Sequence, residues 1–174
     1  MSVIDTRQLR DACSQFGTGV TIITTRHDGH DHGMTANAFM SISLDPPLVA
    51  ISISKHAKMH AKVEQSRQFA VSILAEGMED LAWHFGGKPK TGLCDFFNRH
   101  DQMPTIANAA AYFVTDLANE IQAGDHSIFI GHVREMSYDS GKRPLLFFRG
   151  RFGGLADPRP APPMLDCAHH EFIW

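Results

Sequence analysis

Short runs of β-branched and large apolar residues, separated by turn residues, are the feature that most constrains how this chain can fold. Three of them read VTIITT at residues 20–25, LVAISIS at 48–54 and FAVSIL at 69–74. β-Branched side chains pack well on a pleated surface, and short apolar runs bounded by turn residues are typical of buried strands. The sequence therefore predicts a mainly β protein.

The rest of the chain supplies further strands. The polar stretch RHDGHDHG at residues 26–33 predicts a hairpin loop, and a strand is expected over 34–43. Pro46 and Pro47 end that strand, because proline has no backbone N–H to donate to a sheet. Further strands are predicted over 111–123, 127–138 and 145–152.

Helices are predicted to be few and short. Asp5 can cap a helix at the N-terminus, and two more helices are expected over 57–65 and 78–85. Many antiparallel strands with few helices imply a small barrel or sandwich with helical caps. We expect one domain over residues 1–155, followed by a proline-rich C-terminal arm over 156–174.

Charge and patterning exclude several classes of protein. The formal net charge is −3, without the basic excess of a nucleic-acid binder. The N-terminal residues are polar, and no apolar run approaches the ~20 residues of a membrane span. The three cysteines are scattered and form no CxxC pair, which favours free thiols. We therefore expect a cytoplasmic protein with no nucleic-acid or membrane partner.

Common metal and catalytic motifs are missing from the sequence. His27, His30 and His32 crowd one polar loop, which is more typical of a solvated hairpin tip than of a metal site. There is no HExxH, no GxGxxG after a strand, no P-loop and no nucleophile elbow. We expect no bound metal and no side-chain nucleophile.

Two segments have the composition to hold a flat, phosphorylated ligand. Residues 33–39 (GMTANAF) place small and hydrogen-bonding residues at a strand end, where a flat ring can approach the backbone. Residues 52–58 (SISKHAK) run from a strand end into a helix start, where hydroxyls, free N–H groups and lysines can cradle a phosphate. Taken singly, each segment is more typical of a barrel strand followed by a solvated turn.

Taken together and in order, the segments of this chain resemble the flavin reductase-like family, the small reductase components of two-component flavin monooxygenases. The resemblance covers roughly residues 10–155 and is most specific in the second and fifth of six segments. These are FGTGVTIITT (16–25), GMTANAFMSISLDPPLV (33–49), KHAKMH (55–60), RQFAVSIL (67–74), GDHSIFIGHV (124–133) and PLLFFRGRFGGL (144–155).

The resemblance implies an FMN-binding split β-barrel that forms a homodimer, with the flavin near the subunit interface. The implied cofactor contacts are Thr35, Ala36, Asn37, Ser52, Ser54, Lys55, Lys58 and Phe152, and the implied catalytic residue is His126. The first three would touch the isoalloxazine, the next four the ribityl phosphate, and Phe152 and His126 the nicotinamide. Ala38 stands where many relatives have serine, and residues 83–98 are less typical of the family.

The implied activity is that of an NAD(P)H-dependent flavin reductase. Hydride would pass from nicotinamide C4 to flavin N5, and reduced FMN or FAD would diffuse to a partner flavin-dependent oxygenase. Such a protein supplies stacking, distance and electrostatics, so no acid–base pair is needed. Two alternatives stay open: a flavoprotein that holds its FMN tightly and serves another acceptor, and a non-catalytic flavin-binding protein. The residues do not decide whether the flavin is FMN or FAD, or whether the cosubstrate is NADH or NADPH.

Overall fold

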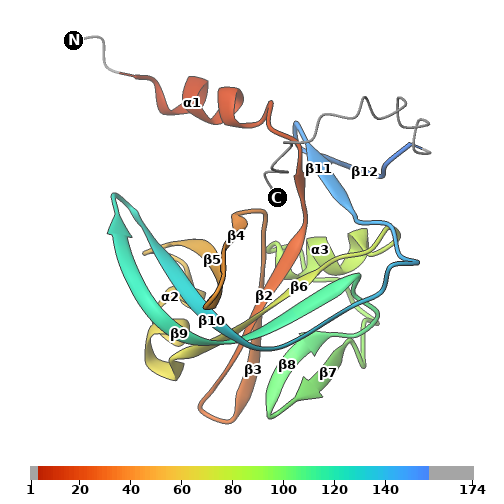
Figure 1. Ribbon diagram of the computed structural model, residues 1–174. Helices are drawn as coiled ribbons and strands as arrows, with labels where there is room; N and C mark the ends of the chain where they lie inside the picture. The colour runs from red at the N-terminus through yellow and green to blue at the C-terminus, as the bar shows by residue number, and fades with distance from the viewer. Residues whose placement is uncertain (1–3, 157–174) are drawn as a thin grey trace, which may run out of the picture.

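Seven antiparallel strands form a strongly curved sheet (Figure 1). The computed structural model describes residues 4–156. The strand order is β3-β2-β6-β9-β10-β5-β4. Their bounds are Thr21–His27 for β2, His30–Ala36 for β3, Phe39–Leu44 for β4, Pro47–Ser54 for β5, Gln68–Ile73 for β6, Ala111–Ala123 for β9 and His126–Tyr138 for β10.

The two edge strands of this sheet, β3 and β4, are consecutive in the chain. Only Asn37 and Ala38 separate them, so the sheet curls around until its edges meet at one corner. Beyond that corner the edges are not paired with each other, and the barrel stays open. The predicted fold class, a mainly β split barrel with short helices, is confirmed.

Smaller elements cover the ends of the sheet. A three-stranded sheet is built from β1 (Thr18–Gly19), β11 (Leu146–Phe148) and β12 (Arg151–Gly153), and a hairpin from β7 (Phe97–His100) and β8 (Met103–Ile106). The helices are α1 (Thr6–Cys13), α2 (Lys58–Ser66) and α3 (Glu79–Phe85). Figure 1 shows α1 standing away from the barrel. No helix within the described range is long and apolar enough to cross a membrane.

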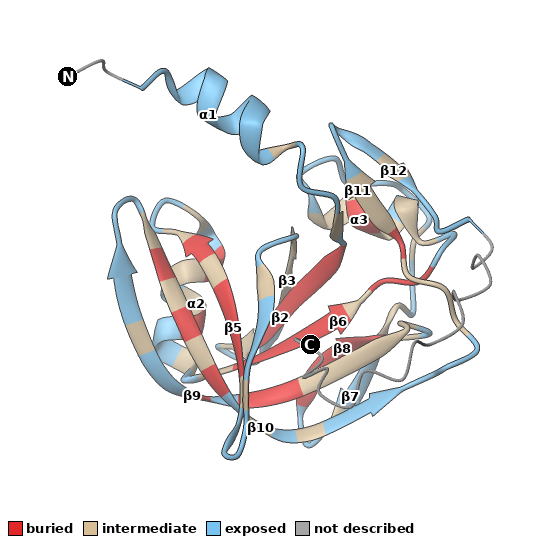
Figure 2. Ribbon diagram, turned by 45° about the horizontal axis from the view of Figure 1, so that its top comes forward, coloured by how far each residue is buried: buried red, intermediate tan, exposed pale blue. Residues whose placement is uncertain are grey.

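The core lies inside the curve of the large sheet and under its two packed helices. Figure 2 shows the buried residues running along the central strands β2, β6, β9 and β10. Phe69 and Phe129 are fully buried there, and α2 adds Met59 and Val63. A second cluster, around Leu74, joins the start of β2 to α3. Apolar side chains therefore fill the inside of the curved sheet, and two helices, α2 and α3, cover this core.

Two of the predicted boundaries are wrong. In both places the chain reverses within two residues that have positive φ angles, so the strands on either side are longer or more divided than predicted. The predicted loop over 26–33 is mostly strand: β2 and β3 continue to an Asp-Gly turn at 28–29, with φ of 50° and 77°. Asp-Gly is typical of such two-residue hairpin turns. The predicted single strand over 145–152 is instead a hairpin that turns at 149–150, with φ of 47° and 78°.

The remaining elements follow the prediction closely, with three exceptions. The expected strand over 34–43 is divided by the corner at 37–38, and neither the short strand β1 nor the hairpin at 97–106 is predicted. The Asp5 cap is confirmed, since its carboxylate accepts the backbone N–H of Arg7 at 2.7 Å. All but the first residue of the predicted arm at 156–174 lies outside the described residues.

A glycine lets helix α3 lie directly on strand β3. A Cβ atom on Gly33 would lie 2.5 and 2.6 Å from two ring carbons of Phe85. Two residues further along β3, the Thr35 hydroxyl donates to the carbonyl oxygen of Ala82 at 2.7 Å. Together these contacts place α3 over the strand that leads into the corner.

Replacing Gly33 should therefore destabilise the protein. For Gly33→Ala we expect a loss of about 1–3 kcal/mol in the free energy of unfolding, because the Phe85 ring must move to admit a methyl group. Urea denaturation measures the loss. Gly153→Ala is the matched control: nothing lies within 4 Å of a Cβ there, so its effect should stay within about 0.5 kcal/mol. Equal losses in the two variants would contradict the close approach as the cause.

Candidate functional site

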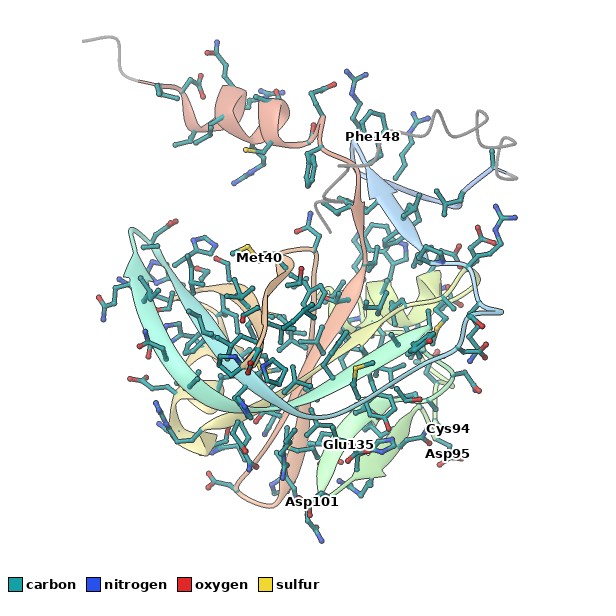
Figure 3. The ribbon with its side chains drawn as sticks, in the orientation of Figure 1. Met40, Cys94, Asp95, Asp101, Glu135 and Phe148 are labelled. Atoms are coloured by element: carbon teal, nitrogen blue, oxygen red, sulfur yellow. The ribbon has the colours of Figure 1, made fainter. Side chains whose placement is uncertain are left out.

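Two hollows flank the corner where the edges of the sheet meet, and Asn37 lines both. The first, here called the aromatic hollow, has a volume of about 210 Å³. The second, the barrel-edge hollow, has a volume of about 560 Å³ and lies between the segment that follows α1 and strands β4, β5 and β10. Met40, which lines it, is labelled in Figure 3 on the side of β4 that faces α1. A ligand can therefore enter on either side of Asn37.

The aromatic hollow has apolar walls suited to a flat ring. Phe152 of β12 meets Trp83 of α3 edge to face, with ring centroids 5.1 Å apart, and meets Phe147 at 5.4 Å. The backbone from Thr35 to Asn37 lies on the β3 side. Three of the predicted contacts to the isoalloxazine and the predicted Phe152 contact therefore share one hollow. Sequence reasoning missed Trp83, which lies in the segment that is less typical of the family.

One residue that lines the barrel-edge hollow, Thr18, carries an unpaired polar group. The hydroxyl oxygen of Thr18 is buried and has no hydrogen-bond partner. Thr18 and Ser52 line this hollow, together with Asn37. A buried hydroxyl without a partner is destabilising, so it points to a ligand with a polar edge. The polar end of an isoalloxazine fits that requirement. Thr18 was not predicted, although it falls within the FGTGV segment.

A positively charged side chain, that of Lys55, lies directly after the end of β5. His126 at the start of β10 pairs with Ser54 at the end of β5. The Lys55 ammonium donates to the carbonyl oxygen of Gly124 at 2.9 Å and to Gln122 Oε1 at 3.2 Å. Both acceptors are neutral, so the positive charge of Lys55 is not compensated there.

Helix α2 begins just beyond this group and adds unpaired donors. Its N-cap residue, Ala57, makes no side-chain hydrogen bond to the first turn, and Lys58 is the first helical residue. The first N–H groups of a helix have no partner within the helix, and such ends attract anions. The structure thus places Ser54, Lys55 and Lys58 together at the end of β5 and the start of α2, with His126 beside them. This group, here called the cradle, has donors and positive charge that can hold a phosphate.

Helix α2 is anchored to the barrel by a histidine. The Nε2 atom of His60 lies 2.8 Å from the hydroxyl oxygen of Ser127 and 3.5 Å from Glu120 Oε1. Its ring also packs against Phe129, with centroids 5.1 Å apart. Ser127 is fully buried and directly follows His126. The cradle at the start of α2 is therefore held against the same strand that carries His126.

The predicted catalytic residue lies apart from the predicted nicotinamide contact within one protomer. The Nδ1 atom of His126 lies 2.8 Å from Asp125 Oδ1, and the His126 side chain is 44% exposed. This hydrogen bond and the charge of His126 lower the pKa of Asp125 from its usual value. In both Figure 1 and Figure 2, the start of β10 and strand β12, which carries Phe152, lie on opposite sides of the molecule. A single chain does not bring the two residues together.

The histidine-rich segment forms ion pairs and hydrogen bonds along β2 and β3. Asp31 is held by Arg26 at 3.1 Å and by Arg99 of β7 at 2.5 Å. Burial acts to raise the pKa of Asp31, but the two arginines outweigh it and leave that pKa below its usual value. Among residues 4–156, no three His, Cys, Asp or Glu side chains are placed to hold a metal ion.

The open barrel of antiparallel strands with short helices is the split-barrel fold of flavin reductases. Residues 13–156 match the family described as flavin reductase like domain, and the chain belongs to that family. It is 39% identical over 150 residues to an NADH-dependent flavin reductase of a Rhodococcus species, covering 84% of this chain and 85% of the relative. It is 36% identical over 149 residues to the reductase component of 4-hydroxyphenylacetate 3-monooxygenase of Thermus thermophilus, covering 86% and 96%.

Solved structures agree with this assignment. The flavin reductase PheA2 in its native state superposes with a TM-score of 0.84 at 44% identity, covering 88% of this chain and 99% of that one. The NADH:FAD oxidoreductase SgcE6 of Streptomyces globisporus, in complex with NAD and FAD fragments, superposes with a TM-score of 0.80 at 34% identity, covering 90% and 98%. The homologues of this protein are therefore flavin reductases, several of them components of two-component monooxygenases.

The unpaired hydroxyl of Thr18 predicts opposite effects of one substitution on folding stability and on flavin binding. Thr18→Val keeps the shape of the side chain and removes the hydroxyl. The free energy of unfolding should stay the same or rise, by up to about 1–3 kcal/mol, because an unpaired buried group is removed. The Kd for flavin should rise roughly fivefold, since a neutral hydrogen bond is worth about 1 kcal/mol. Urea denaturation and fluorescence titration with flavin measure the two effects.

Thr115→Val is the matched control for that variant. The Thr115 hydroxyl is buried and donates to the carbonyl oxygen of Phe69 at 2.8 Å, so its removal breaks a buried hydrogen bond. This variant should be destabilised by about 1 kcal/mol and should bind flavin normally. A Thr18→Val variant that behaves like Thr115→Val would show that the Thr18 hydroxyl serves folding and no ligand.

Proposed function

We propose that this protein is an NADH-dependent flavin reductase that delivers reduced flavin to a separate monooxygenase. The observation that carries the proposal is the pair of hollows sharing Asn37, one aromatic and one with an unpaired hydroxyl, in a chain of the flavin reductase like family. Two planar ligands can meet there face to face. We further propose that it acts in the cytoplasm, where reduced nicotinamide dinucleotides are available.

The residues present fit a flavin, and we assign FMN as the ligand, with FAD as the alternative. Asn37 and Ala36 lie where the ring would approach the backbone, while the Thr35 hydroxyl already donates to Ala82 and offers the ring only its lone pairs and methyl group. Ser52 lies on β5 between the barrel-edge hollow and Ser54, which belongs to the cradle, so a phosphate shared by FMN and FAD would lie at the cradle. A bound flavin would supply the acceptor for the hydride of the reduced nicotinamide.

The protein itself contributes position and environment. Phe152 gives the nicotinamide an aromatic wall, together with Trp83 and Phe147, and this wall excludes water from the ring. Lys55 and Lys58 hold the flavin phosphate by charge. His126 is proposed to orient the nicotinamide or to stabilise the negative charge of the reduced ring. None of these roles requires a nucleophile.

The direct test is oxidation of NADH in the presence of added FMN, FAD or riboflavin. We expect multiple turnovers with free flavin and transfer of electrons from the released flavin to an oxygenase. NADPH in place of NADH defines the cosubstrate. A protein that retains its flavin through purification and reduces no added flavin would support the tightly bound alternative. No NADH oxidation with any flavin would support the non-catalytic alternative, and either result would reject the reductase.

We also propose that the protein acts as a homodimer. Helix α1 has eight residues and none of them is buried, although an isolated helix of this length is unstable in water. Leu9 and Phe16 are 54% and 76% exposed on this segment. On the nearby edge strand β4, Met40 and Leu44 are 51% and 72% exposed. A second copy would cover both surfaces, and a site shared between two chains could unite His126 with Phe152.

Light scattering tests the dimer. We expect a dimer at micromolar concentration, and we expect Leu44→Lys to shift it toward monomer because a charge would enter the apolar interface. Met136→Lys is the control, since Met136 is similarly exposed, at 49%, on the far part of β10. A native protein that stays monomeric at this concentration would disprove the dimer.

The phosphate cradle predicts a difference between flavins. Lys55→Met should weaken binding of FMN by about 10- to 150-fold, the range of a charge-assisted contact, and should weaken riboflavin much less. Lys62→Met is the control, because the Lys62 ammonium lies 3.4 Å from His32 Nε2, one helical turn beyond the cradle. Equal losses for FMN and riboflavin would refute the assignment of Lys55 to the phosphate.

The proposed role of His126 predicts a loss of rate rather than of binding. His126→Ala should lower kcat and kcat/KM together, by roughly 30- to 1000-fold if the contact is worth about 2–4 kcal/mol in the transition state. Flavin affinity should change little. Asp125→Asn, which keeps a hydrogen-bond partner for Nδ1, should have a smaller effect. Stopped-flow measurement of flavin reduction decides the matter: an unchanged rate would leave His126 as a structural residue of the hairpin.

A further inference from the structure

The loop that follows α3 carries two lysines in different surroundings. The Lys88 ammonium lies 4.2 Å from the centroid of the Trp83 ring, and the Lys88 backbone N–H donates to the carbonyl oxygen of Trp83 at 3.0 Å. The Lys90 ammonium, two residues later, is bonded to the carboxylate of Asp80. Both lysines are exposed. One positive charge in this loop is therefore neutralised and the other is not.

Lys88 is a positive charge with free donors. Over the described part of the chain, no carboxylate lies within ion-pair distance of it. The face of an indole ring attracts a cation but does not replace the hydrogen-bond acceptors that an ammonium seeks. Trp83 thus holds the Lys88 side chain in place while its N–H groups remain available. An anion arriving at this position would meet an ordered cation.

Trp83 also connects this cation to the aromatic hollow. The same ring lines the hollow and packs edge to face against Phe152. Helix α3 is held by the close approach of Phe85 to Gly33 and by the Thr35 hydroxyl bond, so Trp83 has a defined place relative to β3. None of the described residues that line the hollow has a charged side chain. Lys88 therefore places a cation one aromatic ring away from an uncharged hollow.

We propose that Lys88, held over Trp83, binds the diphosphate of the reduced nicotinamide dinucleotide whose ring occupies the aromatic hollow. The inference rests on the proposed function and adds a residue that determines recognition of the cosubstrate. A reduced nicotinamide is uncharged and suits apolar walls, whereas the diphosphate attached through its ribose is anionic and needs a cation outside them. The flavin phosphate has its own cations at Lys55 and Lys58, on the far side of Asn37.

Lys88→Met and the matched control Lys90→Met test the proposal in steady-state kinetics. For Lys88→Met we expect the KM for NADH to rise about 10-fold, the lower end for a charge-assisted contact, because the site is exposed. The kcat at saturating NADH and the Kd for FMN should stay within about twofold, which separates Lys88 from the flavin contacts. Lys90→Met should leave all three unchanged. Lys88→Arg, which retains the charge, should recover most of the NADH affinity.

A hydride donor without phosphates provides the decisive comparison. With 1-benzyl-1,4-dihydronicotinamide, Lys88→Met should be as fast as the native protein, and only the native protein should show a KM for NADH that rises steeply with salt. A loss of rate with the benzyl donor, equal effects at residues 88 and 90, or weakened FAD in place of weakened NADH would each overturn the proposal.

Calorimetric titration with NADH separates this inference from the proposed function. If the native protein binds NADH, and Lys88→Met binds it about 10-fold more weakly, the inference holds even where no flavin is reduced. If the native protein turns over with the benzyl donor but Lys88→Met binds NADH normally, the reductase stands and the inference fails. If the native protein binds no NADH, both fail.

Discussion

The site depends on one constraint: two strands that follow each other directly form opposite edges of the same sheet. Asn37 and Ala38 are all that joins β3 to β4, so the seven strands must curve until these edges meet. An open sheet edge normally invites pairing with another chain. Here the region around the corner carries the two hollows, and Asn37 lines both of them. The open seam of the barrel is thus the place where two planar molecules can lie against one another.

Close packing of α3 on β3 turns one side of this seam into an aromatic site. The absence of a side chain at Gly33 admits the Phe85 ring, and the Thr35 hydroxyl fastens the helix through Ala82. As a result Trp83 reaches Phe152, although the two are distant in the chain. The same contacts also fix the position of the loop that follows α3, in which Lys88 lies over the Trp83 ring. The small and hydrogen-bonding residues Gly33 and Thr35 of β3 therefore position helix α3, in addition to any contact with a ligand.

The other side of the seam is mostly apolar and carries a few polar groups, among them Thr18 and Ser52. It holds the buried Thr18 hydroxyl without a partner, and it is bordered by an N-terminal helix that buries no residue. The cradle at Lys55 and the imidazole of His126 lie at the strand ends beyond it, away from Phe152. The homodimer that we propose would cover the exposed apolar side chains on α1 and β4, and it would bring a second chain to this side of the seam.

Local sequence was sufficient for the strands whose signal is a run of β-branched or apolar residues. It predicted β5, β6, β9 and β10 closely, as well as the Asp5 cap, because these depend on nearest neighbours along the chain. The resemblance of six segments also identified the family. Only the tertiary structure decided that the strand expected over 34–43 breaks at the corner, and that Trp83 and Thr18 line the hollows. Contacts between segments far apart in the chain, such as Phe85 on Gly33, leave no periodic signal in the sequence, because their cause is the packing of one surface on another.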